Sequence, residues 1–229
     1  EDESLDWYEP PTAQTTDDVP TIIYFPGITG SSESIYTKKF IDDFFRNSSA
    51  LPFRIIVYNR PGTVQSLSKV KFFLNPSTMQ VAHIVDHVDN QLQQKSPLIL
   101  IGLSTGGNNI LRYLGTFGRN INPRIRGALA LSHFYNTHTC VMTLANSKIY
   151  NTFMLNAIKS VVKKNRHLLE EFEASQQSPT TQKLDLHHLD TCKNIFEFDS
   201  KFLAPIHNYK NIVEDYYYPR SVTEKHLAN

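Results

Sequence analysis

The sequence predicts an α/β protein built on a mostly parallel sheet that helices flank. Two observations support this fold class. Several short apolar runs have the character of strands, and segments with helical spacing alternate with them along the chain. At 229 residues the chain can bury one substantial core, so we expect one domain with an insertion.

Four strands of this sheet are expected, and the first two end at turn signals, Pro26-Gly27 and Asn59-Arg60-Pro61-Gly62. The four strands cover residues 21–25, 54–58, 97–101 and 127–131. A further segment, Ser4-Leu5-Asp6-Trp7-Tyr8, is expected to add a short edge strand within the acidic stretch 1–20.

Helices are expected between these strands, at residues 35–46 and 77–94 and from Gly107 onward. In the second of them the apolar residues recur at helical spacing, at positions 81, 84, 85, 88 and 92. Strands that alternate with helices imply right-handed crossovers and therefore parallel neighbours in the sheet.

The pattern changes after residue 132, where the apolar strand-like runs stop. Residues 150–173 predict one long amphipathic helix, and residues 180–218 predict shorter helices joined by polar turns. We therefore divide the chain into the N-terminal part of an α/β core (1–132), a helical cap insertion (133–218) and a tail (219–229).

Composition excludes several classes of protein. A net charge of +1 argues against broadly basic nucleic-acid binders. The two cysteines, Cys140 and Cys192, lack metal or redox spacing, so no disulfide scaffold is implied, although one bridge between them is left open. We expect no metal and no cofactor. No apolar run approaches ~18 residues, so we expect no transmembrane segment within the chain.

The segment Gly102-Leu103-Ser104-Thr105-Gly106 follows the third expected strand and leads into a helix. Strand, G-x-S-x-G and helix together form the nucleophile elbow, in which the serine occupies a strained turn and its hydroxyl projects above the sheet. The flanking glycines are expected because side chains there would collide with the neighbouring strand and helix. The alternative is a Gly/Ser-rich turn before an ordinary helix.

Acyl-transfer hydrolysis needs a nucleophile, a base and a site for the oxyanion. Ser104 is the candidate nucleophile. The backbone N–H of Thr105 is the first candidate oxyanion donor, and the N–H of Ile28, in the loop after the first strand, is the second. Gly27 is expected to let this loop approach the serine. The alternative is that the loop only ends a strand.

The base is harder to find, because elbow hydrolases place an acid and then a histidine after later strands, and none of the nine histidines has that context. His83 and His87 are spaced i, i+4 on a predicted helix and are expected to lie on a solvated face rather than to bind a metal. His133 is expected to mark the hinge of the cap, with a role as substitute base as the alternative. The other histidines are His138, His167, His187, His188, His207 and His226, and all except His226, which lies in the tail, are expected to have surface or packing roles.

A run of basic residues follows on the long predicted cap helix, comprising Lys159, Lys163, Lys164, Arg166 and His167. We expect these side chains to form a plain solvated face. The alternative is contact with the anionic lipid of a membrane surface.

Taken together, these motifs resemble the ABHD-type α/β-hydrolase lipases and esterases, in the AB hydrolase 4 family. The resemblance covers nearly the whole chain. It is carried by Ser4–Trp7, Phe25–Ser31 (L-P-G-L-T-G in the family), Gly102–Gly115, Asn194–Phe202, Asn208–Lys210 and Asp215–Tyr217. The segment Tyr58-Asn59-Arg60-Pro61-Gly62 is similar to the family's F-N-x-R-G loop but departs from it, because Pro61 intrudes.

The resemblance implies an α/β-hydrolase fold and an esterase or lipase acting on acylglycerols, phospholipids or related acyl esters. It implies membrane association through an anchor upstream of Glu1, and an acid and a histidine on two further strands after the cap, about 60–100 residues beyond this chain. We therefore expect the chain alone to be a poor catalyst. The alternative is an incomplete short form that acts as a lipid-binding or regulatory protein. The oligomeric state is left open.

Overall fold

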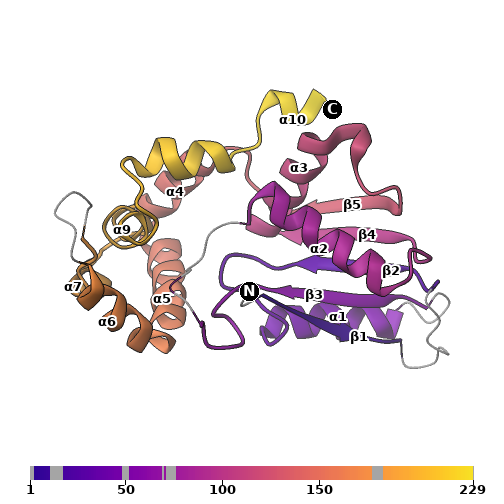
Figure 1. Ribbon diagram of the computed structural model, residues 1–229, viewed down its shortest axis with the longest axis horizontal. Helices are drawn as coiled ribbons and strands as arrows, with labels where there is room; N and C mark the ends of the chain where they lie inside the picture. Colours follow the sequence, from indigo (N-terminus) through magenta and orange to yellow (C-terminus); the bar gives the residue numbers. More distant parts are fainter. Residues whose placement is uncertain are drawn as a thin grey trace. The chain divides into compact units, whose positions relative to one another are not determined.

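The computed structural model describes residues 3–10, 18–47, 52–68, 70, 76–176 and 183–228. The chain divides into two compact units (Figure 1). The α/β unit comprises Glu3–Arg60, Asn75–Tyr135 and Val222–Asn229, and the helical unit comprises Pro61–Leu74 and Asn136–Ser221. The predicted domain boundaries after residues 132 and 218 stay a prediction.

The α/β unit is organised around a five-stranded sheet in the order β1-β3-β2-β4-β5. The strands are β1 (Ser4–Tyr8), β2 (Thr21–Phe25), β3 (Arg54–Asn59), β4 (Leu98–Leu103) and β5 (Ile125–Leu131). Strand β1 pairs antiparallel with β3, and every other pair is parallel. The mostly parallel sheet and its short edge strand are therefore confirmed.

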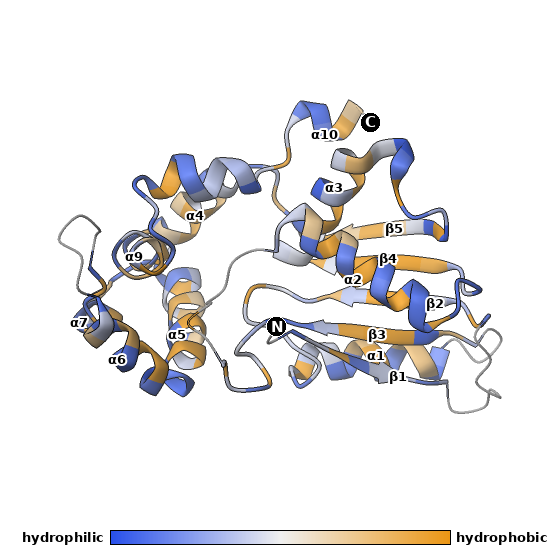
Figure 2. Cartoon of the chain, viewed as in Figure 1, coloured by the Kyte–Doolittle hydropathy of each residue, from blue (hydrophilic) through white to orange (hydrophobic). Residues whose placement is uncertain are grey.

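Helices cover both faces of this sheet, as Figure 1 shows. Helix α1 (Ile35–Asn47) packs on one face, and α2 (Thr78–Gln91) and α3 (Thr105–Phe117) pack on the other. Because successive side chains of a strand point to opposite faces, Ile22 joins the core under α1 while Ile23 joins the core under α2 and α3. Burial of each such side chain stabilises the fold by about 1.5–3 kcal/mol. Figure 2 shows the hydrophobic residues along these strands.

The last short helix of the chain, α10 (Glu224–Ala228), packs on α3 within the α/β unit. The contact is between backbones. A Cβ atom added at Gly115 of α3 would overlap the backbone of His226. Gly115 therefore permits α10 to lie against α3.

The helical unit contains short helices without a described strand. They are α4 (Thr137–Asn146), α5 (Lys148–Lys164), α6 (Arg166–Ser175), α7 (His187–Thr191), α8 (Ile195–Phe198) and α9 (Ala204–His207), with the π-helical turns Asp199–Leu203 and Val213–Tyr217 and the 3-10 turn Tyr218–Arg220. A second 3-10 turn, Gly118–Asn120, follows α3 in the α/β unit.

The single long helix predicted over residues 150–173 is wrong, because the helix breaks at Asn165 between α5 and α6. The buried side-chain amide of Asn165 donates to the carbonyl of Val161 (3.1 Å), and its oxygen accepts from the backbone N–H of Leu67 (2.8 Å). The side chain thus takes the carbonyl that a continuing helix would offer to the backbone. Asn165 instead donates its own N–H to Val162 (3.0 Å).

The helical unit also contains a buried hydrogen-bonded pair of side chains, Asp199 and Tyr217. The Tyr217 hydroxyl donates to Oδ2 of Asp199 at 2.7 Å, and the ring of His138 stacks on Tyr217. Burial raises the pKa of the Asp199 carboxyl to about 7, and the bond from Tyr217 partly opposes that rise. Both cysteines, Cys140 and Cys192, are free thiols.

Candidate active site

Ser104 lies where β4 ends and α3 begins, with φ 55° and ψ −116°. A residue with a side chain adopts this backbone conformation only when its surroundings impose it. Two backbone hydrogen bonds do so here. The N–H of Ser104 donates to the carbonyl of Leu131 (2.8 Å), and its carbonyl accepts from the N–H of Asn108 (3.1 Å). The strained strand–turn–helix geometry fits the predicted elbow, and the nucleophilic role of Ser104 stays a prediction.

The glycines that flank the serine are required by their neighbours, as the sequence predicted. A Cβ atom added at Gly102 would overlap the backbone of Gly106. A Cβ atom at Gly106 would overlap the carbonyl oxygen of Phe25 and lie 2.9 Å from that of Pro26. The first turn of α3 therefore rests directly on the end of β2.

The loop after β2 lies beside the serine. The N–H of Gly30 donates to the carbonyl of Gly27 (3.0 Å), which closes a turn whose central residues are Ile28 and Thr29. The N–H of Ile28 is therefore not the donor that closes this turn. Ile28 and Thr105 lie in the elements where the sequence placed them, and their roles as oxyanion donors stay predictions.

The expected reason for Gly27 is wrong. A Cβ atom at this position would lie 3.7 Å from the Cβ of Ser104, which is ordinary van der Waals contact, so the approach of the loop does not require glycine there. Gly30 is the position in this loop that excludes a side chain, because the Tyr36 hydroxyl occupies that space. Burial raises the pKa of Tyr36, although the nearby charge of Arg60 acts against this rise, so the hydroxyl keeps its proton at neutral pH.

Arg60 is a residue of this region that the sequence analysis missed as part of the site. It directly follows β3 and is buried, and its Nη2 donates both to the carbonyl of Pro26 (3.0 Å) and to Oγ1 of Thr105 (2.7 Å). The sequence feature that could have identified Arg60 was a charged residue directly after a strand that is buried along its whole length.

His133 follows β5, directly after Ser132, which has a positive φ of 47°. Its Cβ lies close to the first turn of α3, 2.9 Å from where a Cβ at Gly107 would stand. Its ring packs edge-on against Tyr135, and its buried Nε2 has no hydrogen-bond partner among the described residues. The two roles considered for His133, a hinge and a substitute base, both stay predictions.

The other histidines lie elsewhere. His83 and His87 are exposed on α2, as expected for a solvated face. Within the described ranges, no group of three or more His, Cys, Asp or Glu side chains is arranged to hold a metal ion.

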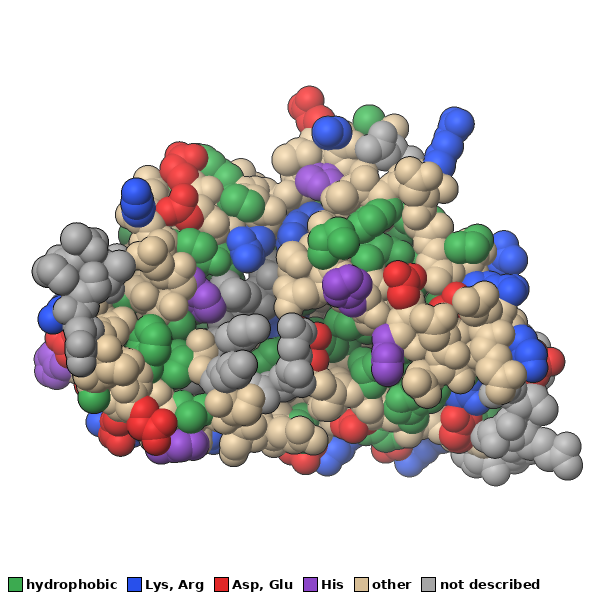
Figure 3. Space-filling view, in the orientation of Figure 1, with side chains coloured by type: hydrophobic (Ala, Val, Ile, Leu, Met, Phe, Trp, Pro, Cys, Tyr) green, Lys and Arg blue, Asp and Glu red, His purple; other side chains and the backbone are tan. Residues whose placement is uncertain are grey.

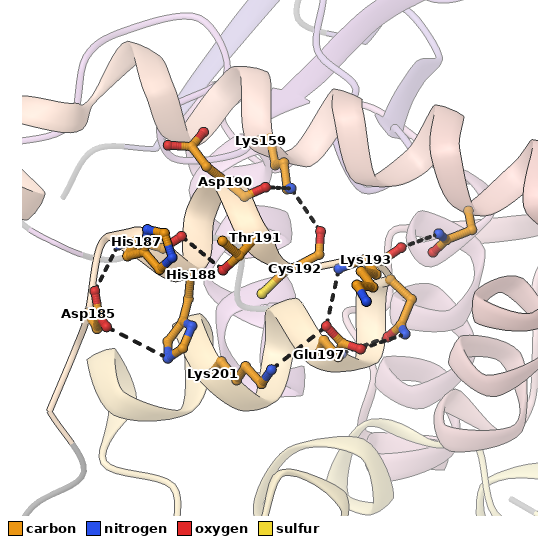
Figure 4. A network of polar contacts seen from close by, with 12 residues as sticks. Lys159, Asp185, His187, His188, Asp190, Thr191, Cys192, Lys193, Glu197 and Lys201 are labelled. Carbon is orange, nitrogen blue, oxygen red and sulfur yellow. Dashed lines mark hydrogen bonds and ion pairs between the residues drawn. The ribbon is translucent and has the colours of Figure 1, made fainter.

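The basic run of the helical unit is exposed apart from the half-buried Lys159, as expected for a solvated face, and several of its side chains are paired. Lys159 donates to the carbonyls of Cys192 (2.9 Å) and Asp190 (3.4 Å), as Figure 4 shows. Lys163 forms an ion pair with Asp190, and Arg166 forms one with Glu170. Exposed pairs of this kind contribute little to stability, because water and salt screen them. In Figure 3, acidic and basic side chains are interspersed over the visible face of the α/β unit.

A cavity of about 610 Å³ is present in the α/β unit, but it lies at the wrong end of the sheet for Ser104. Asp86, Asp89, Asn122, Arg124 and Arg126 are among its lining residues, near the points where β4 and β5 begin. Ser104 follows the other end of β4. None of the helices that the structure describes has both the length and the hydropathy needed to cross a bilayer.

Comparison with known proteins gives three findings. Residues 20–197 match a family described as "alpha/beta hydrolase fold". The chain is 29% identical over 221 residues to "Phospholipase ABHD3" of Mus musculus, covering 93% of this chain and 49% of that protein. It is 24% identical over 220 residues to "Monoacylglycerol lipase ABHD2" of Homo sapiens, covering 93% of this chain and 50% of that protein.

Among solved structures, Est1E from Butyrivibrio proteoclasticus with ferulic acid bound is 17% identical, with a TM-score of 0.44. That match covers 57% of this chain and 49% of Est1E. The chain spans about half the length of the curated relatives it matches.

Proposed function

Because the chain belongs to the alpha/beta hydrolase fold family and is of the ABHD type, we propose that its protein hydrolyses carboxylic esters of lipids, with Ser104 as nucleophile. The single observation that carries the proposal is the backbone of Ser104. This residue is held at φ 55° between a central parallel strand and a helix, beside the loop after β2. An ordinary turn gains nothing from this strain, whereas an elbow uses it to present the hydroxyl.

In the proposed reaction, Oγ of Ser104 attacks the acyl carbonyl carbon and its proton passes to a general base. The carbonyl oxygen becomes an oxyanion, which accepts hydrogen bonds from the N–H groups of Thr105 and Ile28. Collapse of this intermediate breaks the ester bond, and the alcohol leaves with the proton from the base. Water then hydrolyses the acyl-serine by the same steps. The acid and the histidine that complete the machinery are expected on later strands, so activity should be measured on the full natural polypeptide.

The printed names of the relatives support lipid esters as substrates, since one is a phospholipase and another a monoacylglycerol lipase. The helical unit adds apolar surface of its own. On α5, Ile149, Tyr150 and Phe153 are 80%, 65% and 71% exposed. Such exposed apolar surface is chemically suited to contact acyl chains. Membrane association of the full natural polypeptide rests on the family resemblance alone.

Most of the apolar side chains of α5 are not available to a ligand. Leu155, Ile158, Val161 and Val162 are buried within the helical unit, so they form its core. Only the first two turns of α5 offer exposed apolar side chains to a ligand. The head group and the acyl chain length are therefore not specified by this helix.

The test is covalent labelling of the full natural polypeptide with a fluorophosphonate, read by intact mass. We expect Ser104→Ala to abolish both labelling and ester hydrolysis. Ser132→Ala is the matched control, because Ser132 is also a serine with positive φ at the end of a strand, and this variant should keep both. Undiminished labelling of Ser104→Ala would overturn the assignment. Lipid binding without labelling of the unaltered protein would support the lipid-binding alternative instead.

A further inference from the structure

We propose that the Arg60 guanidinium holds together the two segments that carry the oxyanion donors, as a positioning residue for ester hydrolysis. This inference rests on the proposed function. It concerns a side chain that the elbow motif does not contain and that follows β3, a strand which is not next to β4.

The hydrogen bonds of Arg60 connect three segments of the α/β unit: the end of β3, the loop after β2 and the first turn of α3. Strand β3 pairs with β1 and β2, and β2 separates it from β4. From the end of β3, Nη2 of Arg60 reaches the carbonyl of Pro26, at the start of the loop that contains Ile28, and Oγ1 of Thr105, in the first turn of α3. One nitrogen therefore bonds both segments, and their separation is fixed by two hydrogen bonds of 3.0 Å and 2.7 Å.

The two bonded segments also meet in one direct contact. The backbone of Gly106 touches the end of β2 so closely that a side chain would overlap the carbonyl of Phe25. Arg60 therefore bridges the segments beside a contact that is already closely packed. A loop that lost this bridge could tilt about the contact, and the N–H groups of Ile28 and Thr105 would then no longer converge on one oxygen atom.

The bridge is charged and shielded from water. Arg60 is 2% exposed and Thr105 is 8% exposed. Hydrogen bonds from a guanidinium are about twice as strong as neutral ones, and its pKa keeps it charged at any working pH. Arg60 also acts on a neighbour through its charge, since it opposes the burial-driven rise in the pKa of Tyr36. A fixed positive charge behind the donors additionally favours negative charge on the bound oxygen.

A purely structural role for Arg60 predicts a different outcome, and the same strand supplies the control. Arg54 begins β3, is 4% exposed and donates to Glu9 at 2.6 Å, at the end of the strand remote from Ser104. Loss of either arginine should destabilise the α/β unit. Only loss of Arg60 should impair the transition state.

The experiment compares Arg60→Met, Arg60→Lys and Arg54→Met in the full natural polypeptide. The measurements are kcat and KM on p-nitrophenyl butyrate, the affinity for a trifluoromethyl ketone that forms a hemiketal oxyanion with the serine, and the melting temperature. For Arg60→Met we expect kcat to fall about 30- to 100-fold and ketone affinity to fall by a similar factor, while KM changes by less than about threefold. Arg60→Lys should recover part of the loss. Arg54→Met should lower the melting temperature without changing kcat.

Thr105→Val gives a second route that does not depend on the folding of the arginine variants. It removes the acceptor hydroxyl but keeps the backbone N–H, and Thr105→Ser, which keeps a hydroxyl, should recover part of the kcat that Thr105→Val loses. The double variant of Arg60→Met and Thr105→Val should lose less than the product of the two single losses, because both remove one interaction. An unchanged kcat in Arg60→Met or Thr105→Val, or an equal loss in Arg54→Met, would overturn the positioning role. An unaltered protein without ester hydrolysis would instead overturn the proposed function itself.

Discussion

The two units differ in how closely the backbones of their segments meet. In the α/β unit, besides buried polar bridges such as that of Arg60, backbones meet at Gly102, Gly106 and Gly115, where a side chain would overlap its neighbour. In the helical unit the segments are joined by buried polar side chains such as Asn165 and Asp199. A close backbone contact requires a glycine, and this glycine can be recognised in the sequence. The sequence does not show which residue a buried amide or carboxyl side chain will bond.

The largest effect is expected from a side chain at Gly106. Gly106→Val should lower the free energy of unfolding by more than about 3 kcal/mol, because the overlap is with the backbone of Phe25 and cannot be relieved by a rotamer change. Urea unfolding followed by circular dichroism measures this loss.

Gly27→Ala is the matched control in the same region. Its added Cβ would make only an ordinary contact, 3.7 Å from the Cβ of Ser104, so stability should change by less than about 1 kcal/mol. The added methyl group would nevertheless stand beside the serine, and we expect slower fluorophosphonate labelling. A strong destabilisation by Gly27→Ala would contradict this view of the loop.

The next effect concerns the pH dependence of the helical unit. The folded pKa of Asp199, about 7, lies above its ordinary value of 3.8, so the folded state binds the proton more tightly than the unfolded state. This group therefore stabilises the fold most at low pH, and its contribution falls as pH rises toward 7. Between about pH 5 and pH 7 we expect a loss of about 2 kcal/mol. Asp199→Asn should remove that loss, as measured by urea unfolding at both pH values.

Tyr217→Phe sharpens the same prediction. The Tyr217 hydroxyl donates to the carboxyl and lowers its pKa, so its removal should raise the pKa of Asp199 further and extend the loss of stability to higher pH. Identical pH dependence in the unaltered protein and Asp199→Asn would refute a titrating carboxyl at this position.

The last effect is expected at Asn165. Asn165→Leu leaves the N–H of Leu67 without its acceptor and should lower the free energy of unfolding by about 1–3 kcal/mol. The specific readout is faster hydrogen exchange at the Leu67 amide.

Asn151→Leu serves as the comparison. Asn151 is also a buried amide, but it accepts from the N–H of Ile195 and donates to the carbonyl of Lys193. Its loss should speed exchange at Ile195 and leave Leu67 unchanged. Equal exchange at Leu67 in both variants would mean that the Asn165 bond is not specific.

The sequence predicted the α/β unit closely because two physical rules act locally there. Apolar runs marked the parallel strands β2, β3, β4 and β5, and helical spacing marked α2 between them. The glycine spacing marked the elbow, and the structure confirmed why Gly102 and Gly106 are needed. The fold class and the ABHD resemblance were confirmed in turn by the comparisons.

What the sequence could not predict depends on partners far away along the chain. Residues 163–167 contain no apolar side chain, but the helical spacing resumes at Leu168, and only the contact with Leu67 shows why the helix ends at Asn165. The link from Arg60 to Thr105 spans 45 residues and three elements of the sheet. Periodicity carries no information about such pairs, since it describes one element at a time.

The contact between Gly106 and Phe25 has a consequence for the inheritance of this motif. Glycine is needed there by the packing of α3 on β2, whatever residue stands at position 104. Selection for a stable fold alone would preserve the two glycines of the elbow in a descendant that had lost its chemistry. The glycine spacing therefore records the ancestry of the scaffold. Whether catalysis is still under selection is recorded only by residues that the fold does not require, and Ser104 is the first of these.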